Sequence, residues 1–148
     1  MHTELAEALH AEHRRVHQLR SMLLARREEY LADLGDPAWL AVRDRLAEFA
    51  GHVDRHFSFE EQEGFMVSVL ENRPALAPNV AVLRDEHDRL RTAFLDLVAL
   101  FDETHVLRER RALVTGRLDA LLVRLDMHER AEDDLVSETV NRELGAMD

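Results

Sequence analysis

The sequence predicts an all-α protein, an up-down-up-down four-helix bundle. Its composition is the first indication: 46% of the residues are hydrophobic and 33% charged, with only 5 Gly and 3 Pro, as is typical of helical proteins. No alternating runs of β-branched residues favour strands instead. At 148 residues the chain has the usual size of one domain, so we expect residues 1–148 to form a single domain.

Three loop signals divide the chain into helical segments. In LGDPAW, Gly35 can close the first helix and Asp36 can cap the second. Two prolines in ENRPALAPN exclude a continuous helix there. In FDETH, Asp102 or Thr104 can cap the last helix. Short loops between long helices favour antiparallel neighbours, which predicts the bundle. The expected helices are residues 2–33, 37–71, 78–102 and 106–143.

Polar residues interrupt the apolar side of the last three helices. Hydrophobic residues recur there every three or four positions, a spacing that marks the side of a helix facing the core. Five positions of this pattern carry polar residues instead: His56, Glu60, His87, His128 and Glu132. We therefore expect all five side chains to point inward.

The first helix carries three histidines near its apolar side. At about 100° per residue, His13 lies nearest to that side, whereas His10 and His17 are displaced towards its flank. We expect His13 to point inward, and we place His52 on the flank of its own helix. The sequence leaves open whether one of the flank histidines replaces or supplements His13 in a site. These flank histidines are His10, His17 and His52. Glu61 is expected to be solvated.

The inward polar residues fall at one level of the bundle. His13 and His87 lie about ten residues after the start of their helices, and the two HxxxE pairs lie about a dozen residues before the end of theirs. In an antiparallel bundle these positions meet. Burying ionised carboxylates is costly without a partner, and a pair of cations would satisfy them together. Imidazole with carboxylate suits iron, manganese or zinc, and the absence of cysteine excludes thiolate ligands.

This arrangement resembles the hemerythrin-like, or HHE cation-binding, family over essentially the whole chain. The motifs that carry the resemblance are a histidine on the first helix, HFSFE at 56–60, His87 within EHDRL, and HERAE at 128–132. The resemblance implies an oxo- or hydroxo-bridged di-iron centre, in which manganese or zinc can substitute for iron. The implied metal ligands are His13, His56, Glu60, His87, His128 and Glu132.

The third helix departs from the pattern of oxygen-carrying hemerythrins, which place two histidines one turn apart there. The positions four before and after His87 are Leu83 and Arg91. The fourth helix of those proteins also carries a histidine and an aspartate five apart, where this chain has His128 and Glu132. One protein ligand fewer leaves a position for water, peroxide or another small ligand.

Three functions follow as hypotheses. The first is a non-haem di-iron protein that binds O2, NO or peroxide in sensing, iron homeostasis or oxidative-stress defence. The second is a peroxide-decomposing, catalase-like di-iron enzyme, so the sequence leaves open whether the protein is an enzyme. The third is a metal-free helical interaction module whose polar core residues specify the register of the bundle.

The charge and the N-terminus bear on partners and location. A formal net charge of -11 argues against nucleic acid, whose recognition rests on clustered Lys and Arg. The N-terminus lacks the basic and apolar regions of a signal peptide, and no run of about 18 apolar residues predicts a membrane span. We expect a soluble, cytoplasmic protein without membrane contact, as a monomer or a homodimer.

Overall fold

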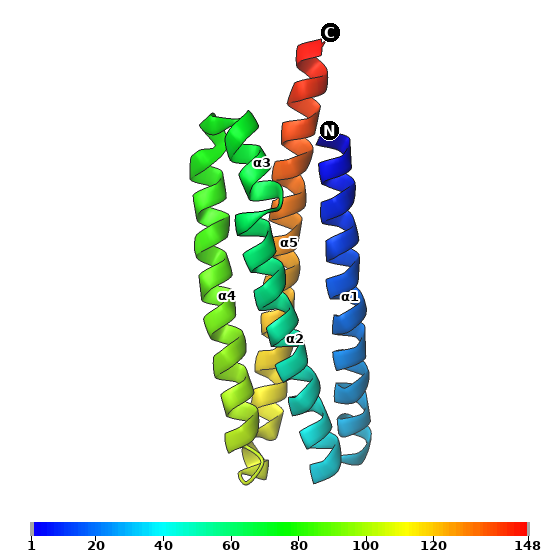
Figure 1. Cartoon of the computed structure of the whole chain (residues 1–148). Coiled ribbons are helices and arrows are strands. Elements are labelled where there is room, and N and C mark those ends of the chain that lie inside the picture. Colours follow the sequence, from blue (N-terminus) through cyan, green and yellow to red (C-terminus); the bar gives the residue numbers. More distant parts are fainter. Residues whose placement is uncertain (1, 148) are drawn as a thin grey trace.

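The protein is a bundle of four helical arms, as the computed structural model shows for the backbone of residues 2–147 and the side chains of residues 4–139 (Figure 1). The arms are α1 (His2–Asp33), α2 (Asp36–Gln62) continued by the short α3 (Phe65–Asn72), α4 (Ala77–Glu103) and α5 (Arg111–Met147). The short 3-10 helices η1 (Pro74–Leu76) and η2 (Arg108–Arg110) lie in the connections. Residues 2–147 contain no strand.

The four arms alternate in direction, and each packs against two of the others. α1 packs against α2 and α5, and α4 packs against the same two helices. Both chain termini lie at one end of the bundle, beside α3 (Figure 1). The predicted all-α, up-down-up-down bundle is therefore confirmed. None of the helices in the described part of the chain combines the length and the apolar character needed to cross a membrane.

The first connection differs from the prediction by one residue. Leu34, and not Gly35, takes the left-handed conformation that ends α1, with φ 58° and its N–H donated to Tyr30 O at 2.6 Å. Gly35 is the N-cap of α2, so Asp36 is already the first helical residue and does not cap it. The carboxylate of Asp36 accepts hydrogen bonds from Arg108 and Arg111 at 2.8 Å each.

The predicted continuous helix 37–71 is wrong, because α2 ends at Gln62 and α3 begins at Phe65. The N–H groups of Glu63 and Gly64 both donate to Phe59 O at 2.8 Å, which closes the end of α2. A Cβ atom at Gly64 would lie 2.9 Å from the Cα of Glu60, so the break requires glycine. After the break, α3 continues along the bundle beside α4 and α5 (Figure 1), and Phe65 is buried in the core.

The predicted start of the last helix at residue 106 is also wrong, because α5 begins at Arg111. Thr104, proposed as an N-cap, instead ends α4 and donates its hydroxyl to Leu100 O at 2.6 Å. The connection is organised by Arg111, which is 1% exposed. Its guanidinium donates to Thr104 O at 3.1 Å and lies 5.0 Å from the ring centre of Trp39.

Two apolar clusters form the core, and a polar layer separates them. The larger cluster extends from the layer towards the first and third connections, and includes Trp39, Phe57 and Phe94. The smaller cluster lies under α3 and η1, and includes Phe65 and Val80. On each arm, buried histidines or glutamates of the predicted site lie where the two clusters meet.

Candidate metal centre

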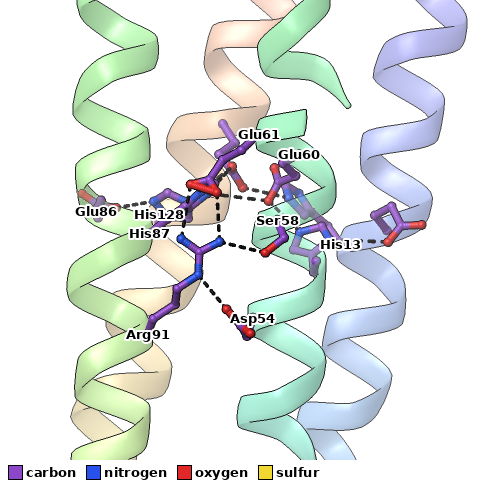
Figure 2. A network of polar contacts seen from close by, with 12 residues as sticks. His13, Asp54, Ser58, Glu60, Glu61, Glu86, His87, Arg91 and His128 are labelled. Atoms are coloured by element: carbon purple, nitrogen blue, oxygen red, sulfur yellow. Dashed lines mark hydrogen bonds and ion pairs between the residues drawn. The ribbon is translucent and has the colours of Figure 1, made fainter. Parts of the chain in front are cut away.

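All six predicted ligands lie in the polar layer, and each is at most 4% exposed. α1 supplies one histidine, α2 and α5 each supply a histidine and a glutamate four residues later, and α4 supplies one histidine (Figure 2). The prediction that these side chains point inward is confirmed. The residues are His13, His56, Glu60, His87, His128 and Glu132.

Glu132 lies at the middle of the layer. Its Oε1 is 3.1 Å from Nε2 of His13, whereas its Oε2 is 3.1 Å from Nε2 of His87 and 3.3 Å from Nε2 of His128. The two oxygens of one carboxylate thus face histidines on opposite sides of the bundle. A carboxylate placed in this way can join two cation sites.

The donor atoms fall into two sets that share Glu132. The ligand atoms of His13, His56, Glu60 and Glu132 all lie within 4.8 Å of one another, and so do those of His87, His128 and Glu132. Oε1 of Glu60 is 2.9 Å from Nε2 of His56 and 3.7 Å from Nε2 of His87, so Glu60 also reaches towards both sets.

The second nitrogen of each histidine faces a carboxylate from a neighbouring arm. Nδ1 of His13 lies 3.0 Å from Asp133, that of His87 lies 3.4 Å from Glu61, and that of His128 lies 2.5 Å from Glu86. For His56 the contact is an ion pair with Glu12 at 3.4 Å. Carboxylates in these positions orient an imidazole so that its other nitrogen can bind a metal.

These four carboxylates form a ring around the bundle, in which the carboxylate of each arm contacts the histidine of the next arm. Glu12 of α1 contacts the histidine of α2, Glu61 of α2 contacts that of α4, Glu86 of α4 contacts that of α5, and Asp133 of α5 contacts that of α1. None of the four was predicted from the sequence, and the prediction that Glu61 is solvated is wrong, since its side chain is 12% exposed. Their positions in the sequence could have indicated them, since each carboxylate is adjacent to an inward-pointing residue.

Arg91 lies one helical turn after His87 on α4. It donates to both oxygens of Glu61, at 2.9 and 3.2 Å, and to Asp54 at 2.7 Å (Figure 2). Its guanidinium lies 5.6 Å from the ring centre of Phe57, which stacks on His87 at 4.0 Å. Arg91 is therefore directed to the carboxylate that supports His87, and an aromatic ring covers the face of that histidine.

Burial sets the charge of the layer. It lowers the pKa of His87 to about 4, so this imidazole is neutral at pH 7, as a metal ligand must be. Burial also raises the pKa of Glu132 well above its ordinary value, and the charge of Glu60 raises it further. Burial alone would raise the pKa of Glu60, but contacts with His56 and Glu132 lower it. Of the two carboxyl groups, Glu60 is thus the one that ionises more readily, and Glu132 is the one that keeps its proton to higher pH.

Several buried polar atoms of the layer have no hydrogen-bond partner among the described residues. They include Nε2 of His56, Nε2 of His128 and both oxygens of Glu60. Nε2 of His56 is 2.9 Å from Glu60, yet the two groups are not aligned for a hydrogen bond. Buried polar groups normally have partners, and groups that converge without bonding one another suit a shared third atom. The residues therefore fit a bound metal.

A cavity of about 360 Å³ opens onto the layer between α1 and the α2–α3 break. His56 and Glu60 lie at its inner end, and its other polar side chains are Glu12 and Glu63. The remaining lining side chains are apolar, including Leu9, Phe59 and Phe65. A small molecule can approach the layer through this cavity.

The flank histidines lie outside both donor sets. The side chains of His10 and His17 are each 50% exposed, and His52 is half-buried. His17 belongs to a third group with Asp126 and the buried Glu129, whose ligand atoms lie within 4.8 Å of one another. Burial raises the pKa of Glu129 to about 7. Glu129 was not predicted from the sequence, although its spacing of seven residues from the buried Leu122 and Val136 places it on the core side of α5.

A four-helix bundle crossed by a buried layer of histidine and glutamate defines a class of cation-binding helical proteins. Within that class, the hemerythrin HHE cation binding domain matches residues 4–138, and the chain belongs to this family. No curated protein and no solved structure matches the chain.

Proposed function

We propose that the layer holds two iron ions and that the protein is a non-haem di-iron protein that binds a small ligand such as O2, NO or peroxide. The observation that carries this proposal is the placement of Glu132, whose two oxygens face different histidines. The proposed role is sensing, iron homeostasis or oxidative-stress defence.

The two ions would have different histidines and common carboxylates. His13 and His56 would hold one ion, His87 and His128 the other, and Glu60 and Glu132 would lie between them. Such a donor set suits iron and also accepts manganese or zinc. Bound iron supplies one-electron redox chemistry and coordination positions for a small ligand. The protein supplies four imidazoles, each with a carboxylate beside its Nδ1 atom.

The surroundings support a small ligand rather than a large substrate. The cavity beside His56 and Glu60 is mostly apolar and leads from the surface to the layer. On the other side, Phe57 covers His87 and limits the approach of water. A diatomic molecule or peroxide fits such an entrance.

Peroxide decomposition is the second candidate function. Its supporting observation is the lack of a second histidine on α4, since position 83 is a core leucine and Arg91 is bound to Glu61 and Asp54. A coordination position left free in this way can serve redox turnover as well as reversible binding.

Metal analysis with an optical spectrum tests the proposal. We expect close to two irons per chain, with iron charge-transfer absorption in the near ultraviolet. The His128→Ala variant should lose metal, whereas His10→Ala, on the exposed flank, should retain it. Metal-free, fully folded wild-type protein would refute the proposal and favour the helical interaction module. Oxygen evolution on adding peroxide would identify the enzyme.

A further inference from the structure

A separate group of donors lies on the seam between α1 and α5, about one helical turn from the proposed centre. Nε2 of His17 is 3.3 Å from Oε2 of Glu129, and the ligand atoms of His17, Asp126 and Glu129 all lie within 4.8 Å of one another. The side chains of these residues are 50%, 21% and 3% exposed, respectively. The group therefore extends from the surface to the interior.

Glu129 is the residue that points to a ligand. Both of its carboxylate oxygens are buried and have no hydrogen-bond partner among the described residues. A buried carboxylate without a partner is costly, and a cation beside His17 would remove that cost. Glu129 belongs to neither donor set of the centre, so the centre does not account for it.

We propose that His17, Asp126 and Glu129 form a separate site for a divalent first-row cation such as Fe²⁺ or Mn²⁺, and that cations pass through it to the centre. One imidazole nitrogen and two carboxylates suit these ions, and the exposed side of the group leaves positions for water. The half-exposed His17 gives access from solvent and lies one helical turn after His13 on α1, whereas the buried Glu129 directly follows His128 on α5. The role of the site in loading the centre with cations rests on the proposed function. The existence of the site does not depend on that function.

Arg20 competes with a cation for this site. Its Nη1 lies 2.9 Å from Oδ2 of Asp126, while its buried Nε has no partner among the described residues. A cation bound to Asp126 must displace this guanidinium or share the carboxylate with it. The Arg20→Gln variant should therefore bind the cation more tightly than the wild type.

A Mn²⁺ titration by calorimetry tests the site independently of the centre. The background is a variant in which His87→Ala and Glu132→Gln disable the centre. Adding Glu129→Gln should remove one equivalent of bound Mn²⁺, whereas adding Asp134→Asn, an exposed carboxylate on the same helix, should remove none. An unchanged number of Mn²⁺ equivalents after Glu129→Gln would overturn the site.

The loading role is tested with the centre intact. Fe²⁺ is mixed with metal-free protein without oxygen, and samples desalted at set times are analysed for retained iron. Asp126→Asn should slow the filling of the centre but leave its final iron content unchanged. A filling rate equal to that of the wild type would overturn the loading role. A wild-type protein that takes up no iron would overturn the proposed function and the loading role together, while the Mn²⁺ titration would still decide the site.

Discussion

At the scale of single residues, the carboxylates behind the histidines determine how well the proposed centre binds metal. Glu86 lies 2.5 Å from Nδ1 of His128 and orients it. The Glu86→Gln variant should weaken metal binding by roughly 10–100-fold while the fold persists. The matched control is Asp85→Asn, which changes the exposed neighbouring residue. Metal titrations of both variants measure the effect, and equal affinities would contradict the role of Glu86.

Glu132 should make the stability of the metal-free protein depend on pH. Its pKa is raised in the folded state above the ordinary value of 4.5, chiefly by burial. The protonated group therefore stabilises the folded state at pH values below the pKa of the unfolded state. This contribution is lost as the pH rises towards the higher pKa of the folded state. The loss should be about 1.4 kcal/mol for each pH unit between the two pKa values.

Urea unfolding of metal-free protein between pH 4.5 and pH 8 measures this dependence. As the pH rises, the free energy of unfolding of the wild type should decline relative to that of Glu132→Gln, which has no proton to lose at this position. Identical slopes in the two proteins would show that Glu132 does not hold its proton more tightly when folded.

The sequence was sufficient to predict the inward residues but not their supporting partners. Periodicity along one helix determines which side chains face the core, so His56 and Glu60 could be recognised from spacing alone. The contacts of Glu12 and Glu86 cross to another helix, and they depend on the rotation of two helices about their axes. That rotation is set by packing and is not visible in one helix.

At the scale of helices, the break between α2 and α3 should be sensitive to substitution. Gly64→Ala would bring a Cβ atom within 2.9 Å of backbone at Glu60, and crowding of this kind typically costs about 1–3 kcal/mol. Because Glu60 is a proposed ligand, metal content should fall too.

Gly116→Ala is the matched control for the break. Its Cβ atom would meet nothing within 4 Å, and alanine in a helix interior should add about 0.5–1 kcal/mol of stability. Thermal unfolding and metal analysis of both variants decide the comparison. A Gly64→Ala protein as stable and as metal-rich as the wild type would show that the break tolerates a side chain.

The stability of the third connection, between α4 and α5, should depend strongly on Arg111 and only weakly on Arg108. Arg111→Met removes the donor to the carbonyls of Thr104 and His105 and should cost about 1–3 kcal/mol. Arg108, whose side chain is 70% exposed, also contacts Asp36 at 2.8 Å, but Arg108→Met should cost less than about 1 kcal/mol. Urea unfolding measures both, and equal losses would contradict this assignment. Metal content should be unchanged in each.

Helix ends were the least predictable elements. The two prolines at positions 74 and 78 marked the second connection correctly, because proline limits a helix by its own covalent structure. The break at Gly64 was missed because glycine alone is a weak stop signal inside an amphipathic pattern. The start of α5 was missed because it depends on Arg111 reaching Trp39 and Asp36, which are distant in sequence.

At the scale of the whole molecule, the polar layer separates a large apolar cluster from a small one, and the proposed metal ions would join them. We also propose that residues 1–148 form one domain, since all four arms contribute to the layer. Metal removal should therefore destabilise the small cluster under α3 more than the large one around Trp39.

Hydrogen exchange followed by mass spectrometry measures this difference. On metal removal, amide exchange should accelerate most in α3 and at the start of α4, whereas the region around Trp39 should retain its protection. A uniform acceleration along the chain would show that the two clusters unfold as one unit.

The ring of carboxylates has a consequence for the handedness of the bundle. Apolar packing alone barely distinguishes a bundle in which successive helices turn to the left from one in which they turn to the right. The mirror arrangement would exchange the two neighbours of every helix, so that Glu12 would face α5 instead of the histidine of α2. All four contacts would then be lost together. The side chains that orient the proposed ligands therefore also favour one of the two topologies.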